Sequence, residues 1–216
     1  MNPPQVDDLP EWDDLPADVK HFFKLSNLLS QPGALFITTR LDPSIGEKAL
    51  QSARGPADWL ADKIKRALES VGIPADQIAF ALELAPKQAK TLHKLHIHGA
   101  LCIPAEMLEQ ASEAITAALA PEYKQHGTNA AVRLDTPNKV GDVAKYVVKE
   151  SVITKDRIIR LRSQLRASSD GKGANPHRAT EIATTGGRTL YSNLRRSLFG
   201  NQEAFHKATQ EIIGED

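Results

Sequence analysis

The chain has 216 residues, of which 41% are hydrophobic and 25% are charged, so it is long enough for one sizeable domain with extensions and short for two full domains. Its single cysteine, Cys102, excludes an intramolecular disulfide, and no apolar run approaches the ~18 residues that cross a bilayer, so we expect a cytoplasmic protein without membrane contact. The formal net charge is zero, but residues 139–207 hold fourteen Lys or Arg against six Asp or Glu, which is typical of a polyanion-binding protein. An uneven scatter of charges on solvated helices is the alternative explanation.

The first residues are acidic and rich in proline. An Asp-Asp-Leu-Pro motif occurs twice, at 7–10 and 13–16, and residues 1–19 contain no Lys or Arg. This composition cannot build a core, so we expect an acidic disordered tail over residues 1–16; a docking peptide or a competitor for the basic surface is the alternative. Residues 17–30 follow with the apolar spacing of an amphipathic helix, which Pro32 and Gly33 would end.

The middle of the chain alternates between strand and helix patterns. We expect strands at 34–41, 78–84, 95–103 and 130–135, and helices at 57–70, 105–119 and 139–151. The two strands at 78–84 and 95–103 would form an antiparallel hairpin. The order is strand, helix, strand, strand, helix, strand, helix (βαββαβα), which predicts an α+β fold: an antiparallel sheet of about four to five strands with helices packed mainly on one face.

The last third of the chain is basic. Residues 152–166 combine five Lys or Arg with an apolar side, typical of a helix that either holds phosphates or packs on the core with its charges solvated. Residues 168–175 have the composition of a flexible loop, and a basic segment around Tyr191 follows. We therefore divide the chain into the tail at 1–16, a main domain at 17–151 and a basic helical C-terminal extension at 152–216.

Two histidines in the predicted strand at 95–103 form a candidate metal site. His96 and His98 are separated by one residue, so their side chains point to the same side of a sheet. Pairing the apolar faces of the hairpin places Glu83 beside them, as a third ligand. Two imidazoles and a carboxylate with open positions suit Mg²⁺ or Mn²⁺, with zinc as a second candidate, whereas isolated surface imidazoles are the simpler interpretation.

A tyrosine and a lysine lie on one side of the predicted helix at 139–151. Tyr146 and Lys149 are three residues apart, so they share a face that differs from the apolar stripe of that helix. A phenol and an ammonium presented together, on the same domain as a metal site, point to metal-assisted phosphodiester chemistry. The alternative is that Tyr146 only caps the apolar edge of its helix.

These motifs together resemble the HUH endonuclease superfamily, which includes rolling-circle replication initiators, conjugative relaxases and related transposases. Leu95-His96-Ile97-His98-Gly99-Ala100-Leu101 is similar to the histidine motif, and Ala144-Lys145-Tyr146-Val147-Val148-Lys149-Glu150 is similar to the tyrosine motif; Phe36-Ile37-Thr38-Thr39 resembles the first motif only loosely. The resemblance covers roughly residues 34–150. Its single tyrosine is similar to that of the replication initiators rather than to the paired tyrosines of other members.

The resemblance implies a metal-dependent enzyme that nicks and joins single-stranded DNA at a replication origin or transfer site. Tyr146 would be the nucleophile, Lys149 would assist it, and His96, His98 and Glu83 would hold Mg²⁺ or Mn²⁺. No Gly-rich phosphate loop of a helicase occurs, so a host helicase would unwind the DNA. We assign DNA binding to the following residues: Thr38, Arg40, Lys145, Arg157, Arg160, Arg188, Arg195 and Arg196.

Three other interpretations remain open at this point. A relaxase or transposase would share the chemistry, a non-catalytic nucleic-acid-binding module would need no tyrosine, and a hydrolase would use metal-bound water. Gly99, next to the histidines, either admits a nucleic-acid backbone or marks a β-bulge.

Overall fold

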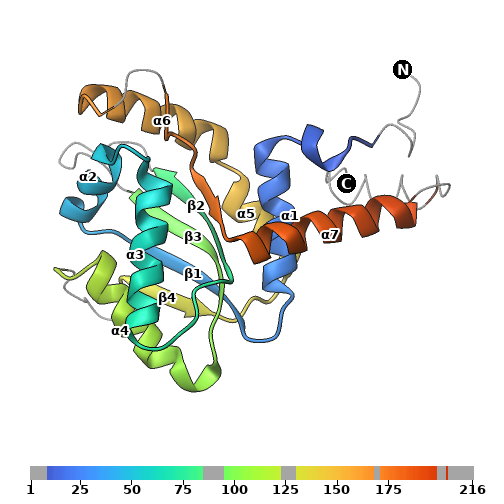
Figure 1. The fold of residues 1–216 in the computed structure, drawn as a ribbon, viewed down its shortest axis with the longest axis horizontal. Helices are drawn as coiled ribbons and strands as arrows, with labels where there is room; N and C mark the ends of the chain where they lie inside the picture. The colour runs from blue at the N-terminus through green and yellow to red at the C-terminus, as the bar shows by residue number, and fades with distance from the viewer. Residues whose placement is uncertain (1–8, 85–94, 123–129, 168–170, 199–202, 204–216) are drawn as a thin grey trace.

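The computed structural model describes residues 9–84, 95–122, 130–167, 171–198 and 203, and in it a five-stranded sheet forms the centre of the molecule (Figure 1). The strands are β1 (Ala34–Arg40), β2 (Ile78–Leu84), β3 (Leu95–Cys102), β4 (Val132–Asp135) and β5 (His177–Ala179). Their order across the sheet is β4-β1-β3-β2-β5, and every neighbouring pair is antiparallel. The α+β class and the antiparallel sheet are therefore confirmed.

Five of the helices fall close to the ranges that the apolar spacing predicts, whereas the helix at Pro43–Gln51 was not predicted. The helices are α1 (Ala17–Leu29), α2 (Pro43–Gln51), α3 (Pro56–Ser70), α4 (Leu108–Leu119), α5 (Val140–Val148), α6 (Ser151–Gln164) and α7 (Glu181–Leu198), with short 3₁₀ turns at Trp12–Asp14 and Ala105–Met107. Among the described residues, no helix combines the length and apolar composition needed to cross a membrane.

The two faces of the sheet carry cores of different size. The larger core joins strand residues such as Ile37, Leu82 and Ile97 to α2, α3 and α4. On the opposite face, the inner strands present small side chains, including Ala79, Ala81 and Ala100, against which α1 and α5 pack. Because these alanines project so little, the two helices lie close to the strands, and α5 is held directly over the face that carries the histidines.

Residues 9–16 differ from the disordered tail that their composition predicts. Trp12 and Leu15 are buried against Tyr191 of α7, and the Tyr191 hydroxyl donates a hydrogen bond to the Pro10 carbonyl at 2.5 Å. Two ion pairs add to this contact, Arg188 with Asp13 at 2.7 Å and Arg195 with Glu11 at 2.8 Å. The prediction was wrong for this part because the acidic motif surrounds a tryptophan that finds an apolar partner far along the chain. Residues 1–8 lie outside the described residues.

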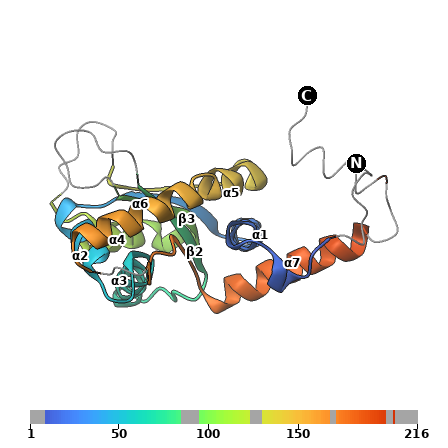
Figure 2. The same ribbon diagram turned by 90° about the horizontal axis from the view of Figure 1, so that it is seen from above.

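The C-terminal third is part of the same fold rather than a separate appendage. It supplies β5, which pairs with β2 at one edge of the sheet, and α6 packs against β2. It also supplies α7, which crosses α1 closely and runs beyond the sheet beside the N-terminal segment (Figures 1 and 2). The crossing depends on two glycines, because a Cβ on Gly186 would overlap Asn27, and one on Gly187 would overlap the Lys24 backbone.

Gly99 allows β2 and β3 to approach each other without a bulge. The register between the two strands is continuous from Ile78 opposite Leu101 to Leu84 opposite Leu95. A Cβ on Gly99 would lie 2.4 Å from the Ala79 carbonyl oxygen and 2.4 Å from the Phe80 Cβ. The glycine is therefore required by the neighbouring strand, and neither the bulge nor a nucleic acid is needed to explain it.

We expect Gly99→Ala to lower the free energy of unfolding by about 3 kcal/mol, because the methyl group has no space in the packed sheet. Urea unfolding followed by circular dichroism measures this change. Gly141→Ala is the matched control: its Cβ meets nothing within 4 Å, and alanine is the better helix former in α5. Equal unfolding midpoints for the two variants would contradict the close approach of the strands.

Candidate metal centre and tyrosine

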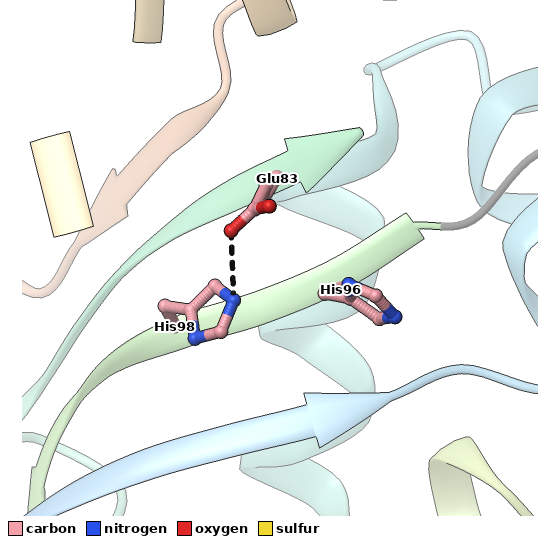
Figure 3. Close-up of side chains that lie close together, drawn as sticks. All are labelled: Glu83, His96 and His98. Atoms are coloured by element: carbon pink, nitrogen blue, oxygen red, sulfur yellow. Dashed lines mark ion pairs between the residues drawn. The ribbon is translucent and has the colours of Figure 1, made fainter. Parts of the chain in front are cut away.

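The register of the central hairpin brings Glu83, His96 and His98 together. Glu83 of β2 lies directly opposite His96 of β3, and His98 is two residues further along β3, so all three side chains emerge on the same face (Figure 3). One ligand atom from each residue lies within 4.8 Å of the other two. The His98 Nε2 is 3.0 Å from the Glu83 Oε2. The structure thus gathers the three residues that the strand parity selected as metal ligands.

The geometry of this cluster is suited to a divalent cation. Metal-to-ligand distances near 2.0–2.2 Å hold ligand atoms roughly 3–4 Å apart, which the spacing of the three groups permits. Two imidazoles and one carboxylate leave coordination positions for water or substrate oxygens. The donor set is compatible with Mn²⁺, Mg²⁺ or Zn²⁺ and does not single out one of them.

His98 is held from both sides of its ring. Its Nε2 faces Glu83, while its Nδ1 is 3.3 Å from the Thr38 Oγ1 on β1, which pairs with it across the sheet. Burial lowers the pKa of His98, with Glu83 opposing that shift. The imidazole is therefore neutral at neutral pH, which is the form that donates a lone pair to a metal ion.

Thr38 therefore contacts the candidate ligand His98, as Glu83 also does. The sequence indicated only a DNA-binding role for Thr38. We expect Thr38→Val, which keeps the branched shape but removes the hydroxyl, to weaken Mn²⁺ affinity by about tenfold, because the orientation of the His98 ring is no longer fixed. Isothermal titration calorimetry with Mn²⁺ measures the change.

Thr39→Val is the matched control for this prediction. Thr39 is the next residue on β1 and points to the opposite face, where its Oγ1 is fully buried and has no hydrogen-bond partner. Removal of this hydroxyl should leave Mn²⁺ affinity unchanged and should not lower the free energy of unfolding. Loss of affinity in both variants alike would argue against a specific role of Thr38.

Helix α5 places Tyr146 beside the candidate metal ligands. Ala144 and Val147 bury one side of α5 in the smaller core, so Tyr146 lies on another side and remains 42% exposed. Its ring is perpendicular to that of His98, with 5.3 Å between the ring centroids. An accessible phenol therefore lies in contact with the candidate metal centre.

Lys149 lies next to Tyr146, over the face of its ring. The Lys149 Nζ is 4.0 Å from the ring centroid, a cation–π geometry. Burial raises the pKa of Tyr146, and the carboxylates of Glu83 and Glu150 raise it further. The phenol is thus protonated at neutral pH, so any nucleophilic role requires that its proton leave as the new bond forms.

The remaining residues that were predicted to bind DNA do not form one surface. Arg40 is exposed at the end of β1 opposite His96, and Lys145 is exposed beside Tyr146, so both lie near the cluster. Arg157 donates a hydrogen bond to the Leu84 carbonyl at 2.6 Å and so ties α6 to the end of β2, whereas Arg160 is exposed.

The three arginines of α7 lie apart from this group. Arg188 and Arg195 pair with the acidic N-terminal segment, and Arg196 is exposed on the same helix, which extends away from the sheet (Figure 2). A role of these residues in binding DNA stays a prediction.

Comparison of the chain with protein-family models, with curated proteins and with solved structures yields no match. The argument for function therefore depends on the side chains of the candidate centre and on the strand and helix that position them.

Proposed function

We propose that this protein is a metal-dependent endonuclease and ligase of the HUH type, which nicks and rejoins single-stranded DNA through a covalent bond to Tyr146. The observation that carries this proposal is the contact between an accessible phenol and His98 of the three-residue cluster, at 5.3 Å between ring centroids. A hydrolase that relies on metal-bound water does not need such a tyrosine.

The chemistry can be written for the residues present. The Tyr146 Oη attacks a backbone phosphorus, an Oη–P bond forms, the bond from phosphorus to the 3′ oxygen breaks, and the released 3′ oxygen takes up a proton as the phenol loses one. The product is a 5′-phosphotyrosine and a free 3′-hydroxyl. Attack by a 3′-hydroxyl reverses the step, so nicking and joining are one reaction in two directions.

Each residue of the centre has a distinct part in this proposal. His96, His98 and Glu83 would hold Mg²⁺ or Mn²⁺, which when bound polarises the phosphate. Thr38 fixes the ring of His98. Lys149 places a positive charge beside the phenol ring, which offsets the negative charge that grows on the Tyr146 oxygen and the phosphate.

The direct test is to detect the covalent intermediate. The protein is incubated with a pool of single-stranded DNA and Mn²⁺, and its tryptic peptides are analysed by mass spectrometry. We expect a nucleotide adduct on the peptide that contains Tyr146. DNA binding without an adduct, across varied sequences and metals, would favour a non-catalytic binding module; cleavage without an adduct would favour hydrolysis by water.

The biological setting follows from the proposal at a coarser level. A single catalytic tyrosine favours initiation of rolling-circle replication of a plasmid or phage, and mobilisation or transposition would use the same chemistry on a different DNA sequence. The partner would be single-stranded DNA at an origin or transfer site, with unwinding supplied by a host helicase.

A further inference from the structure

A polar pocket lies on the tyrosine side of the sheet, between α1, β5 and the start of α7. Its volume is about 290 Å³. The polar residues that line it come from these three elements and from the segment before β5: Lys20, His21, Lys24, Asn175, His177, Arg178 and Thr184. Its residues are distinct from the metal cluster. The two sites lie on the same cross-strand row of the sheet. Ala81 of β2 pairs with His98 of β3 on one side and with His177 of β5 on the other.

Two stacked imidazole rings are among the side chains that line this pocket. The rings of His21 and His177 are parallel within 5°, with 4.4 Å between their centroids. The His177 Nε2 is 2.6 Å from the Ser151 hydroxyl, whereas the His21 Nε2 is fully buried and has no hydrogen-bond partner. Only 2% of His21 is exposed. Burial is the main cause that lowers the pKa of both rings, so the two stacked imidazoles are neutral at neutral pH.

Positively charged side chains collect around these rings, and the carboxylate of Asp18 acts on His177. Lys24 is half-buried, and burial, Lys20 and Arg178 lower its pKa in that order. Among the described residues, no carboxylate forms an ion pair with Lys24. Lys20 donates to the Asp13 carbonyl at 2.7 Å, and Arg178 pairs with Asp58 at 3.3 Å. The pocket thus holds two ammonium groups that repel each other in the absence of an anion.

We infer that this pocket binds a phosphate group of the single-stranded DNA that passes over the tyrosine. The inference rests on the proposed function for its choice of DNA. Two ammonium groups, an amide and a hydroxyl offer the donors that phosphate oxygens require. The chain from α5 into α6 connects the two sites. Tyr146 lies in α5, and Ser151, whose hydroxyl contacts His177, is the first residue of α6. A phosphate here would hold the flank of the strand while its scissile bond lies at Tyr146.

Lys24→Gln tests the inference through the salt dependence of binding. The substitution is made in the Tyr146→Phe background, and the affinity for a fluorescent single-stranded oligonucleotide is measured without metal at several salt concentrations. We expect about a tenfold loss of affinity at low salt. The slope of log affinity against log salt should shrink by about 0.7, the value for one phosphate contact on a single strand.

Lys65→Gln is the matched control, because Lys65 is an exposed lysine of α3 with its side chain 58% accessible. It should change neither affinity nor slope measurably. A thermal unfolding curve of each variant excludes loss of the fold as the cause. If Lys24→Gln binds the oligonucleotide with the slope of the parent, the assignment of a DNA phosphate to this pocket is overturned.

Inorganic phosphate separates this inference from the proposed function. Burial is the main cause that lowers the pKa of His177 to about 4, and a bound phosphate should raise it, as followed by NMR of the ring protons of His21 and His177. A response to phosphate, together with the salt effect of Lys24→Gln, supports the inference. A response to phosphate without any binding of single-stranded DNA would overturn the proposed function and the DNA assignment, and leave an anion site. No response of either ring would overturn the anion site itself.

Discussion

Tyr146→Phe should abolish the covalent adduct with single-stranded DNA and reduce nicking by at least about 1,000-fold, while leaving DNA binding nearly unchanged. The substitution removes only the Oη atom, and the ring that contacts His98 and underlies Lys149 is retained. The fold should tolerate this change, because Tyr146 is 42% exposed and lies outside the two cores. Nicking is measured with end-labelled oligonucleotides, and the adduct by mass spectrometry.

Tyr191→Phe provides the matched control for this experiment. It also removes one phenol oxygen, in this case the donor to the Pro10 carbonyl, on a helix that lies away from the metal cluster. The adduct on Tyr146 should persist in this variant. Residual adduct in Tyr146→Phe at the parent level would show that another residue is the nucleophile, and the proposed mechanism would be wrong.

The second large effect concerns the metal ligands. His98→Ala should weaken Mn²⁺ affinity by at least about 100-fold, because it removes the most buried ligand and leaves Glu83 without its partner. Glu83→Gln keeps the size of the side chain but removes its charge, and a loss of about 10- to 100-fold is expected. Calorimetry with Mn²⁺ gives both values, and nicking assays at saturating metal show whether activity follows occupancy.

Two substitutions serve as controls for the metal experiment. Glu69→Gln removes a carboxylate on α3 that pairs with Lys65 at 3.7 Å. His177→Gln removes an imidazole from the same face of the sheet but outside the cluster. Neither should change Mn²⁺ affinity. If His98→Ala and His177→Gln weaken binding equally, the ion binds elsewhere.

The pH dependence of metal affinity has a defined sign. Protons compete with the metal ion for His98, and burial lowers the pKa of this imidazole below its usual 6.5. Competition therefore begins at a lower pH than for an exposed histidine, and Mn²⁺ affinity should be constant above neutrality and fall only on acidification below the usual histidine pKa of 6.5. A loss of affinity that begins above pH 7 would contradict this assignment.

The candidate ligands could be predicted from the sequence, because they depend only on which face of two neighbouring strands each side chain occupies. Side chains alternate in a strand, so the apolar faces of the two strands fixed which face would carry Glu83, His96 and His98. Tyr146 followed from the amphipathic pattern of its helix in the same way. The contact of Thr38 with His98 could not be predicted, since it requires the pairing of β1 with β3 across sixty residues of chain.

The elements that the sequence did not indicate are short or depend on distant partners. Strand β5 has three residues, too few for an alternating pattern, and only its pairing with β2 makes it a strand. Helix α2 begins at Pro43, which suits a first helical turn but also fits the end of a strand. The packing of Trp12 on Tyr191 joins residues that lie far apart in the sequence, so no local pattern reveals it.

The strand order also determines when each part of the centre forms as the chain leaves the ribosome. The inner strands β1, β2 and β3 are complete once residue 102 has been made, and they already carry all three ligands together with Thr38. The edge strands β4 and β5 and the tyrosine helix are synthesised later. A nascent chain can therefore have its candidate ligand hairpin in place before it possesses Tyr146, and under the proposed function the capacity to cut DNA would arise only after the candidate metal-binding part has been built.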